Sequence, residues 1–184
     1  LPRFDPLRKW GLQAAAKRVL GQHRISVCMA AVRHDWSEVQ VRQALESGRA
    51  YYAGVLACGS VWVCPVCASK IQQVRAEELR QAIAEAEAQG LSTALLTLTV
   101  PHTRHDTLAD LLDGFTGALG ALTSGKAWKT RVRPSYGLAG YVRSLEVTWC
   151  EASGWHPHAH VALFLRAGVD LGELADRLFP LWQQ

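Results

Sequence analysis

The spacing of hydrophobic and polar residues changes several times along this chain and predicts a succession of strands and helices. Apolar residues and threonines run almost without interruption over 91–100 and stop at Pro101, which is typical of a strand. Similar patterns occupy 137–150 and 157–166. Helical spacing and capping residues predict four helices: 5–20 capped by Asp5, 68–90, 106–122, and a last helix capped by Asp170. This order of elements predicts an α+β fold, an antiparallel sheet with helices on one face.

A shorter hairpin is predicted in the N-terminal half, where 38–43 alternates, 46–48 forms a turn and 51–56 leads back. With 184 residues, of which 49% are hydrophobic, the chain can bury one sizeable core and fold a smaller subdomain. We expect the subdomain to occupy 1–90 and the main core 91–184.

Four cysteines are expected to hold a structural zinc ion: Cys28, Cys58, Cys64 and Cys67. Cys64 and Cys67 have the spacing of a zinc knuckle, Cys58 lies close enough to join them, and the hairpin would return the chain toward Cys28. For the fourth ligand, the alternative to Cys28 is His34 or a carboxylate. A closed four-thiolate site would fold the small subdomain and leave no position for a substrate. The remaining cysteine, Cys150, is expected to be a free thiol.

The composition narrows the class of protein. No stretch of about 18 apolar residues occurs, so the sequence predicts no membrane span. The first residues contain neither an initiator methionine nor an apolar signal segment, which favours an internal fragment of a cytoplasmic protein. The net charge is +4, and residues 1–50 hold nine lysines and arginines against four acidic residues.

Two histidines separated by one residue, His158 and His160, are the most informative feature of the sequence. On a strand alternate side chains share a face, so both imidazoles would point to one side and could bind one metal ion. A hairpin centred near Ser153 would place Glu146, on the preceding strand, opposite His160. This ligand set suits Mn²⁺, Mg²⁺ or Zn²⁺, so the metal is left open. The alternative is that the histidines are hydrogen-bonded core or edge residues.

A basic segment with interleaved aromatic residues lies at 126–136. Cations neutralise phosphates and aromatic faces stack on unpaired bases, so this segment is a candidate contact for single-stranded DNA; a solvated loop is the alternative. The candidate DNA-binding residues are Lys126, Trp128, Lys129, Arg131, Arg133 and Arg143.

Three segments together resemble the motifs of HUH endonucleases, specifically the rolling-circle plasmid replication initiators: LTLTV at 96–100, LEVT at 145–148 and GWHPHAHV at 154–161. The segment 58–67 resembles the cysteine-rich segment of these initiators, and the order of the motifs agrees. The resemblance extends over about 28–165. It implies a ferredoxin-like or RNA-recognition-motif-like sheet, with the histidines on a central strand.

The resemblance also implies a reaction, the metal-dependent nicking and joining of one DNA strand at a plasmid origin. In this family a tyrosine attacks the scissile phosphate and stays linked to the 5′ phosphate, while the free 3′-OH primes synthesis. The metal would be Mn²⁺ or Mg²⁺ on Glu146, His158 and His160, with His102 and His156 as orienting residues or alternative ligands. Single-stranded and double-stranded origin DNA, a host helicase and a host polymerase are the implied partners.

The nucleophilic tyrosine is not identified in this sequence. The family places it on a helix downstream of the histidines, whereas all the tyrosines here precede His158: Tyr51, Tyr52, Tyr136 and Tyr141. We therefore expect a nuclease core that lacks its C-terminal part. Two other functions stay open, a zinc-dependent DNA-binding module without nuclease activity and a metal-dependent hydrolase of small molecules.

Overall fold

The computed structural model describes residues 7–183 and divides into two compact units, Leu1–Glu78 and Leu79–Gln184. The division falls within helix α2 (Pro65–Ala88), earlier than the boundary expected after residue 90. The predicted cap at Asp5 lies outside the described residues. Among the described helices, none is both long and apolar enough to cross a bilayer.

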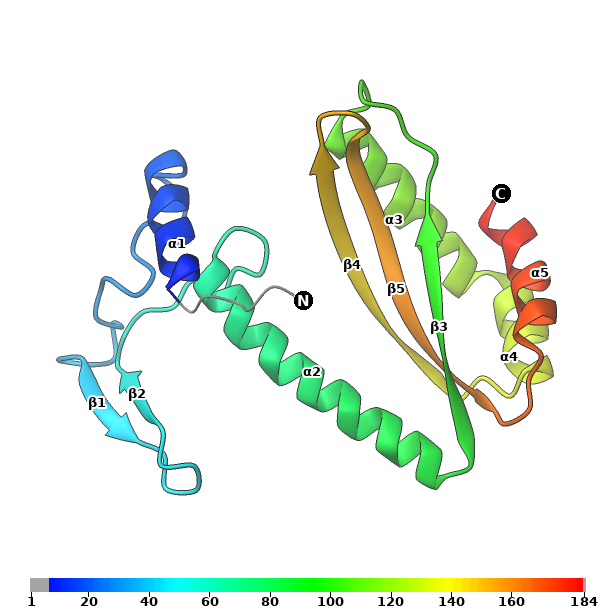
Figure 1. Ribbon diagram of the computed structural model, residues 1–184, viewed down its shortest axis with the longest axis horizontal. Coiled ribbons are helices and arrows are strands. Elements are labelled where there is room, and N and C mark those ends of the chain that lie inside the picture. Colours follow the sequence, from blue (N-terminus) through cyan, green and yellow to red (C-terminus); the bar gives the residue numbers. More distant parts are fainter. Residues whose placement is uncertain (1–6, 184) are drawn as a thin grey trace. The chain divides into compact units, whose positions relative to one another are not determined.

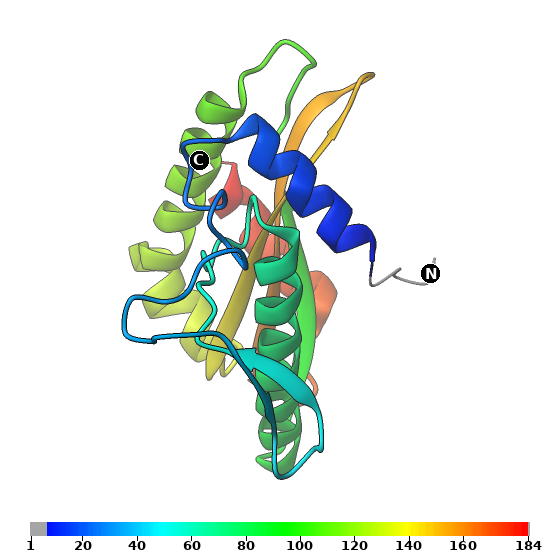
Figure 2. The same ribbon diagram turned by 90° about the vertical axis from the view of Figure 1, so that its left-hand side faces the viewer.

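The N-terminal unit contains helix α1 (Arg8–Val19), the first part of α2, and a hairpin of β1 (Gln40–Gln43) and β2 (Ala50–Ala53). In both views the hairpin lies at the end of this unit away from α1 (Figures 1 and 2). Both strands are shorter than predicted. The hydrophobic cluster of the unit consists of Ile25 and the four cysteines predicted to bind zinc. A unit this small buries little apolar surface, so the four cysteines occupy its centre in place of the larger hydrophobic core of a bigger domain.

The C-terminal unit is built on three antiparallel strands, β3 (Leu91–Thr99), β4 (Gly140–Cys150) and β5 (Gly154–Arg166). Their order is β3-β5-β4, so β5 is the central strand (Figure 1). The predicted α+β class with an antiparallel sheet is therefore confirmed.

Successive side chains of β5 point to opposite faces of this sheet. Ala159, Val161, Leu163 and Leu165 belong to the buried core, together with Phe115 and Leu119 of helix α3 (Leu108–Ser124). The even-numbered residues, His158 and His160 among them, lie on the other face. One strand thus supplies both the centre of the core and the half-buried imidazoles on the opposite face.

Helix α5 (Leu171–Trp182), the last element of the chain, packs against the same hydrophobic core. Its predicted start is confirmed, because the Asp170 side chain accepts hydrogen bonds from the backbone N–H groups of Gly172 and Glu173. Leu174 and Leu178 are buried, and the Trp182 indole N–H donates to the Thr99 carbonyl at 2.7 Å. This bond ties the end of α5 to the end of β3.

Residues 128–135, predicted as part of an exposed loop or DNA contact, are helical. They form a π-helical turn, η1 (Trp128–Val132), which continues into α4 (Arg133–Ser135). Trp128, Val132 and Tyr136 are buried at a spacing of four residues, the spacing of one helix face. The charged residues between them face outward, so the segment is amphipathic.

The turn between β4 and β5 depends on a glycine. Gly154 has φ +77, and a Cβ atom there would lie 2.8 Å from the Arg104 Cα atom of the loop after β3. We expect Gly154→Ala to lower the free energy of unfolding by about 1–3 kcal/mol, because it adds both backbone strain and a collision with main-chain atoms. Urea denaturation followed by tryptophan fluorescence measures this change.

Gly117→Ala is the matched control, since Gly117 lies in α3 with open space around its Cβ position. That change should stabilise the protein by about 0.5–1 kcal/mol through helix propensity. Equal effects of the two substitutions would contradict the role given to Gly154.

Candidate metal centres

The face of the sheet opposite α3 carries a group of three side chains that converge, Glu146, His158 and His160. Glu146 lies opposite His158, and Ser144 lies opposite His160. The expectation that Glu146 would lie opposite His160 is therefore wrong. The turn is centred at residue 152 rather than 153, since Cys150 pairs with Gly154. Moving the centre by one residue moves each partner by two, which keeps Glu146 on the same face.

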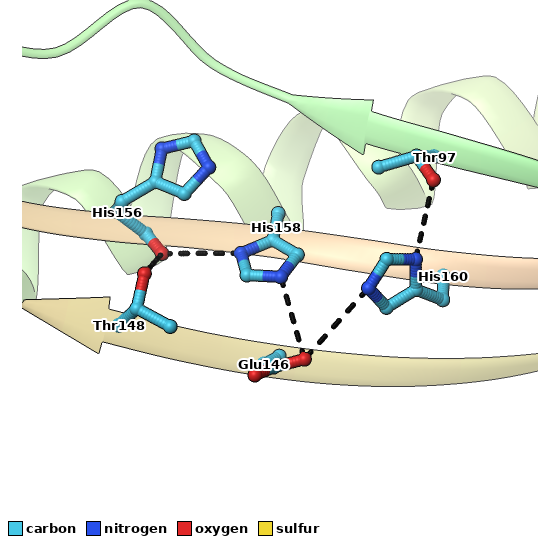
Figure 3. Close-up of polar contacts among 6 residues, drawn as sticks. All are labelled: Thr97, Glu146, Thr148, His156, His158 and His160. Atoms are coloured by element: carbon cyan, nitrogen blue, oxygen red, sulfur yellow. Dashed lines mark hydrogen bonds and ion pairs between the residues drawn. The ribbon is translucent and has the colours of Figure 1, made fainter. Parts of the chain in front are cut away.

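The distances within this group fit a shared cation. The Glu146 Oε2 atom lies 3.4 Å from His158 Nε2 and 3.7 Å from His160 Nε2 (Figure 3). Ligand atoms bound about 2.1 Å from one ion lie about 3.0–3.4 Å apart at octahedral or tetrahedral angles. A shift of a few tenths of an ångström would close the site, and the half-exposed Glu146 side chain leaves it open to solvent.

Hydrogen bonds on the far side of each ring determine which nitrogen is available to a metal. His158 Nδ1 lies 3.3 Å from the His156 carbonyl oxygen, which can only accept, so Nδ1 carries a proton and Nε2 is the nitrogen that a metal could bind. His160 Nδ1 is bonded to the Thr97 hydroxyl of β3 at 3.2 Å. Both Nε2 atoms then face the Glu146 carboxylate (Figure 3). A cation between these three atoms could accept both Nε2 lone pairs and balance the carboxylate charge, so this donor set fits a divalent metal.

His102 and His156 flank the group without joining it. Their Nδ1 atoms are 3.4 Å apart, and the His156 ring stacks on that of His158 with centroids 4.9 Å apart. Burial, and then the neighbouring His102 and His158, lowers the pKa of His156. A neutral His156 adds no positive charge beside the group, and it orients His158 through both its carbonyl and its ring.

The second group consists of the thiols of Cys28, Cys58, Cys64 and Cys67, all buried. The Sγ atom of Cys28 lies 3.8 Å from that of Cys64 and 3.6 Å from that of Cys67, and Cys58 lies 3.7 Å from Cys67. Four sulfurs about 2.3 Å from one zinc ion at tetrahedral angles are about 3.8 Å apart. Cys28 completes this group and His34 is not part of it.

Backbone pairing explains how Cys28 reaches the other cysteines. The Met29 N–H donates to the Leu56 carbonyl at 2.7 Å, and Val32 forms a β-bridge with Val55. The segments after Cys28 and before Cys58 therefore run side by side. The Cys58 N–H points to Cys28 Sγ at 3.4 Å, a contact common to metal-bound thiolates.

In the absence of a bound metal, the thiols of this group differ in acidity. Burial raises the pKa of Cys28 to about 12 and also raises that of Cys67. Burial acts in the same direction on Cys64, but hydrogen bonds from the Cys67 backbone and from the buried Gln13 amide, at 3.3 Å, outweigh it and lower the Cys64 pKa to about 7. Cys64 thus ionises more readily than Cys28 or Cys67, and a bound cation would displace the remaining protons. Nothing in the sequence pattern indicated Gln13 for this role.

The predicted DNA-binding residues differ in burial and in the element that carries them. Trp128 is 2% exposed and packs edge-on against Tyr141 with centroids 5.8 Å apart, so the expectation that it stacks on a base is wrong. The spacing of Trp128, Val132 and Tyr136 could have revealed this buried helix face. Lys126, Lys129, Arg131 and Arg133 are exposed. Arg143 is exposed on β4, on the face opposite to the histidines.

Comparison with known proteins places these groups in a family. The model of a replication-protein family matches residues 53–169, which include three of the four clustered cysteines and the whole Glu146 group. The chain belongs to this replication-protein family. The sequence-based assignment to the plasmid replication initiators is thereby confirmed at the level of the family.

Two curated relatives of this replication protein come from Streptomyces. The "Protein rep" of Streptomyces lividans is 34% identical over 152 residues, covering 69% of this chain and 33% of the relative. The "Neomycin resistance protein" of Streptomyces cyanogenus is 34% identical over 154 residues, covering 71% and 35%. The chain thus spans about a third of the length of these relatives. No solved structure matches the replication protein.

The four-thiol group predicts that the chain binds zinc and that each thiol is needed to retain it. Cys64→Ser should lower zinc affinity by at least about 100-fold and unfold the N-terminal unit, because three thiolates leave the ion incompletely held. Zinc content per chain after dialysis against a chelator, measured by mass spectrometry, tests this. Cys150→Ser is the control, since Cys150 is exposed and outside the group. Equal zinc retention by both variants would contradict the assignment.

Proposed function

We propose that this chain carries the strand-nicking centre of a rolling-circle plasmid replication initiator, on a sheet of the HUH endonuclease type. The convergence of Glu146, His158 and His160 on an open sheet face supports this most directly. Membership in a replication-protein family also supports this proposal, because strand nicking at an origin is a step that starts replication. The proposed substrate is single-stranded DNA at the origin, reached in the cytoplasm with a host helicase and polymerase.

The three side chains of the site have separate tasks. The carboxylate of Glu146 supplies the negative charge that attracts a divalent cation, and His158 and His160 fix its position through neutral nitrogens held by the His156 carbonyl and the Thr97 hydroxyl. Mn²⁺ or Mg²⁺ bound there would place positive charge beside the oxygens of the scissile phosphate. Because the group is open to solvent, a phosphate has room to approach it.

In the proposed reaction a tyrosine hydroxyl attacks the phosphorus, the bond to the 3′ oxygen breaks, and the enzyme keeps the 5′ phosphate. The tyrosines described in this chain do not serve this role. Tyr136 is buried and its hydroxyl donates to Glu173 at 3.1 Å, and Tyr141 packs on Trp128 on the core side of β4. Tyr51 and Tyr52 both belong to β2 and precede the histidines in the sequence, whereas the family motif has its tyrosine after them. We therefore place the nucleophile outside these 184 residues.

The exposed cations of the basic segment, and Arg143 on β4, are proposed contacts for DNA phosphates: Lys126, Lys129, Arg131, Arg133 and Arg143. The Arg166 N–H donates to the Tyr136 carbonyl, which places the segment beside the end of β5 far from His158. From His160 to Arg166 the strand rises about 20 Å. The cations of this segment would therefore meet nucleotides well away from the cleaved phosphate, whereas Arg143 lies opposite Val161, next to His160 along β5 but on the other face of the sheet. Zinc on the four cysteines is proposed as the structural ion of the N-terminal unit.

The proposal is tested with the protein expressed from its complete gene. Incubation with Mn²⁺ and single-stranded DNA of the plasmid that encodes it should give a covalent protein–DNA species on a denaturing gel, and chelation should abolish it. The double variant His158→Ala/His160→Ala should lower adduct formation by at least about 100-fold, because the cation loses two ligands.

His34→Ala is the matched control, since this exposed histidine belongs to the other unit. Undiminished adduct formation by the double variant would refute the metal role. A wild-type protein that binds the DNA and forms no adduct would instead support a DNA-binding module without nuclease activity.

A further inference from the structure

We infer that Trp149 and Trp155 form a stacking site for an unpaired nucleobase at the tip of the β4–β5 hairpin. The two residues are directly opposite each other in the register of the strands. Their ring centroids lie 6.3 Å apart with the planes inclined at 57°. Trp149 is 58% exposed and Trp155 is 37% exposed. The inference rests on the proposed function, because it names a further contact for the same DNA strand.

The exposure of this pair contrasts with the other tryptophans of the C-terminal unit. Trp128 is buried in the core, and Trp182 is half-buried with its N–H bonded to the Thr99 carbonyl. Indoles are large apolar groups that folding normally covers. Two of them side by side at the surface therefore present an apolar face that a ligand with its own flat face can cover.

The hairpin tip holds the pair in a fixed position before any ligand binds. Trp149–Trp155 is the second-last pair of the ladder, followed by Cys150–Gly154. At Gly154 the backbone of Thr103 and Arg104 packs against the turn so closely that a Cβ atom has no room. The same contact brings the exposed Arg104 to the tip, where its charge suits a DNA phosphate. The turn itself carries one acidic residue, Glu151.

The position of the pair relative to the metal-binding group fits a neighbouring nucleotide. Trp155 lies three residues before His158, and Trp149 three residues after Glu146, about 10 Å along either strand. Three stacked nucleotides span about the same length, and fewer do so in an extended strand. The base at the tip would therefore lie one to three nucleotides from the cleaved phosphate.

The two indoles point to the face opposite the histidines, so the DNA strand has to cross the sheet margin. The structure leaves a route, because β4 is an edge strand and the pairing of β3 with β5 ends at Thr99 and His158. Beyond that point the ribbon is two strands wide. A base that crosses there leaves the metal-binding face, and its contact with the indoles requires no metal.

A nucleobase fits the tip better than a protein partner does. A stable protein interface buries on the order of 1,000 Å² or more, whereas this patch consists of two side chains beside the polar residues Glu151 and Ser153. Stacking of bases on aromatic side chains needs only the ring faces and tolerates any base sequence. We expect the site to prefer unpaired bases, since paired bases keep their faces within the duplex.

The test measures binding of a fluorescent twelve-nucleotide oligo(dT) in EDTA by anisotropy. The double variant Trp149→Ala/Trp155→Ala should bind at least about tenfold more weakly than the wild type, and Trp149→Phe alone, which keeps an aromatic face, should bind within about threefold of the wild type. Trp62→Ala is the matched control, because Trp62 is 64% exposed and lies in the other unit. Equal thermal melting curves of the variants and the wild type exclude a folding defect.

Wild-type affinity of the double alanine variant, an equal loss with Trp62→Ala, or an equal loss with Trp149→Phe would overturn the inference. So would unchanged oligo(dT) affinity combined with a change of oligomeric state, which would indicate self-association at the tip. The outcome is separable from that of the proposed function. Loss of adduct formation by His158→Ala/His160→Ala tests the metal-binding group in Mn²⁺, whereas oligo(dT) binding by the tryptophan variants in EDTA tests the indoles without a metal, so either result can fail alone.

Discussion

The alternation of side chains along β5 is the constraint on which the C-terminal unit depends. Ala159, Val161, Leu163 and Leu165 are fixed in the core against α3, and this fixes His158 and His160 on the other face. Because β5 pairs on both sides, β3 supplies the Thr97 hydroxyl and β4 supplies the Glu146 carboxylate. The packing of the core and the geometry of the site are therefore one property of a single strand. A change of register by one residue would lose both.

The N-terminal unit differs from the C-terminal unit, because it buries few apolar side chains that could hold its segments in place. Four thiols and Ile25 occupy its centre, and α1 is connected to them by polar groups. The Gln13 amide donates to Cys64 Sγ, and Lys17 Nζ donates to the Cys28 carbonyl at 2.6 Å. In such a unit the free energy of metal binding is a large part of the free energy of folding. Its stability and the chemistry of the sheet face thus rest on different interactions.

The sequence predicted what depends on short-range patterns, and it failed where tertiary packing decides. The Asp170 cap and the strand at 91–100 follow from local chemistry, and the Cys28 group follows from ligand spacing. The partner of Glu146 was wrong by two residues because the centre of the turn is not encoded in strand alternation, yet the face was right because the period is two. The segment around Trp128 was misjudged because its cations were given more weight than the four-residue spacing of Trp128, Val132 and Tyr136, which are buried in the core.

The two candidate metal groups differ in the way that separates a structural from a reactive site. The thiols of the cysteine group are all buried, and four ligands fill a tetrahedral shell, so a substrate atom has no coordination position there. The Glu146 group offers three ligand atoms on an open face, which leaves positions for oxygen ligands of a six-coordinate ion. The contacts of His158 Nδ1 with the His156 carbonyl and of His160 Nδ1 with the Thr97 hydroxyl keep both Nε2 atoms aimed at that position. A metal ion held by this group could therefore accept a phosphate oxygen as a further ligand, whereas an ion held by the four thiols could not.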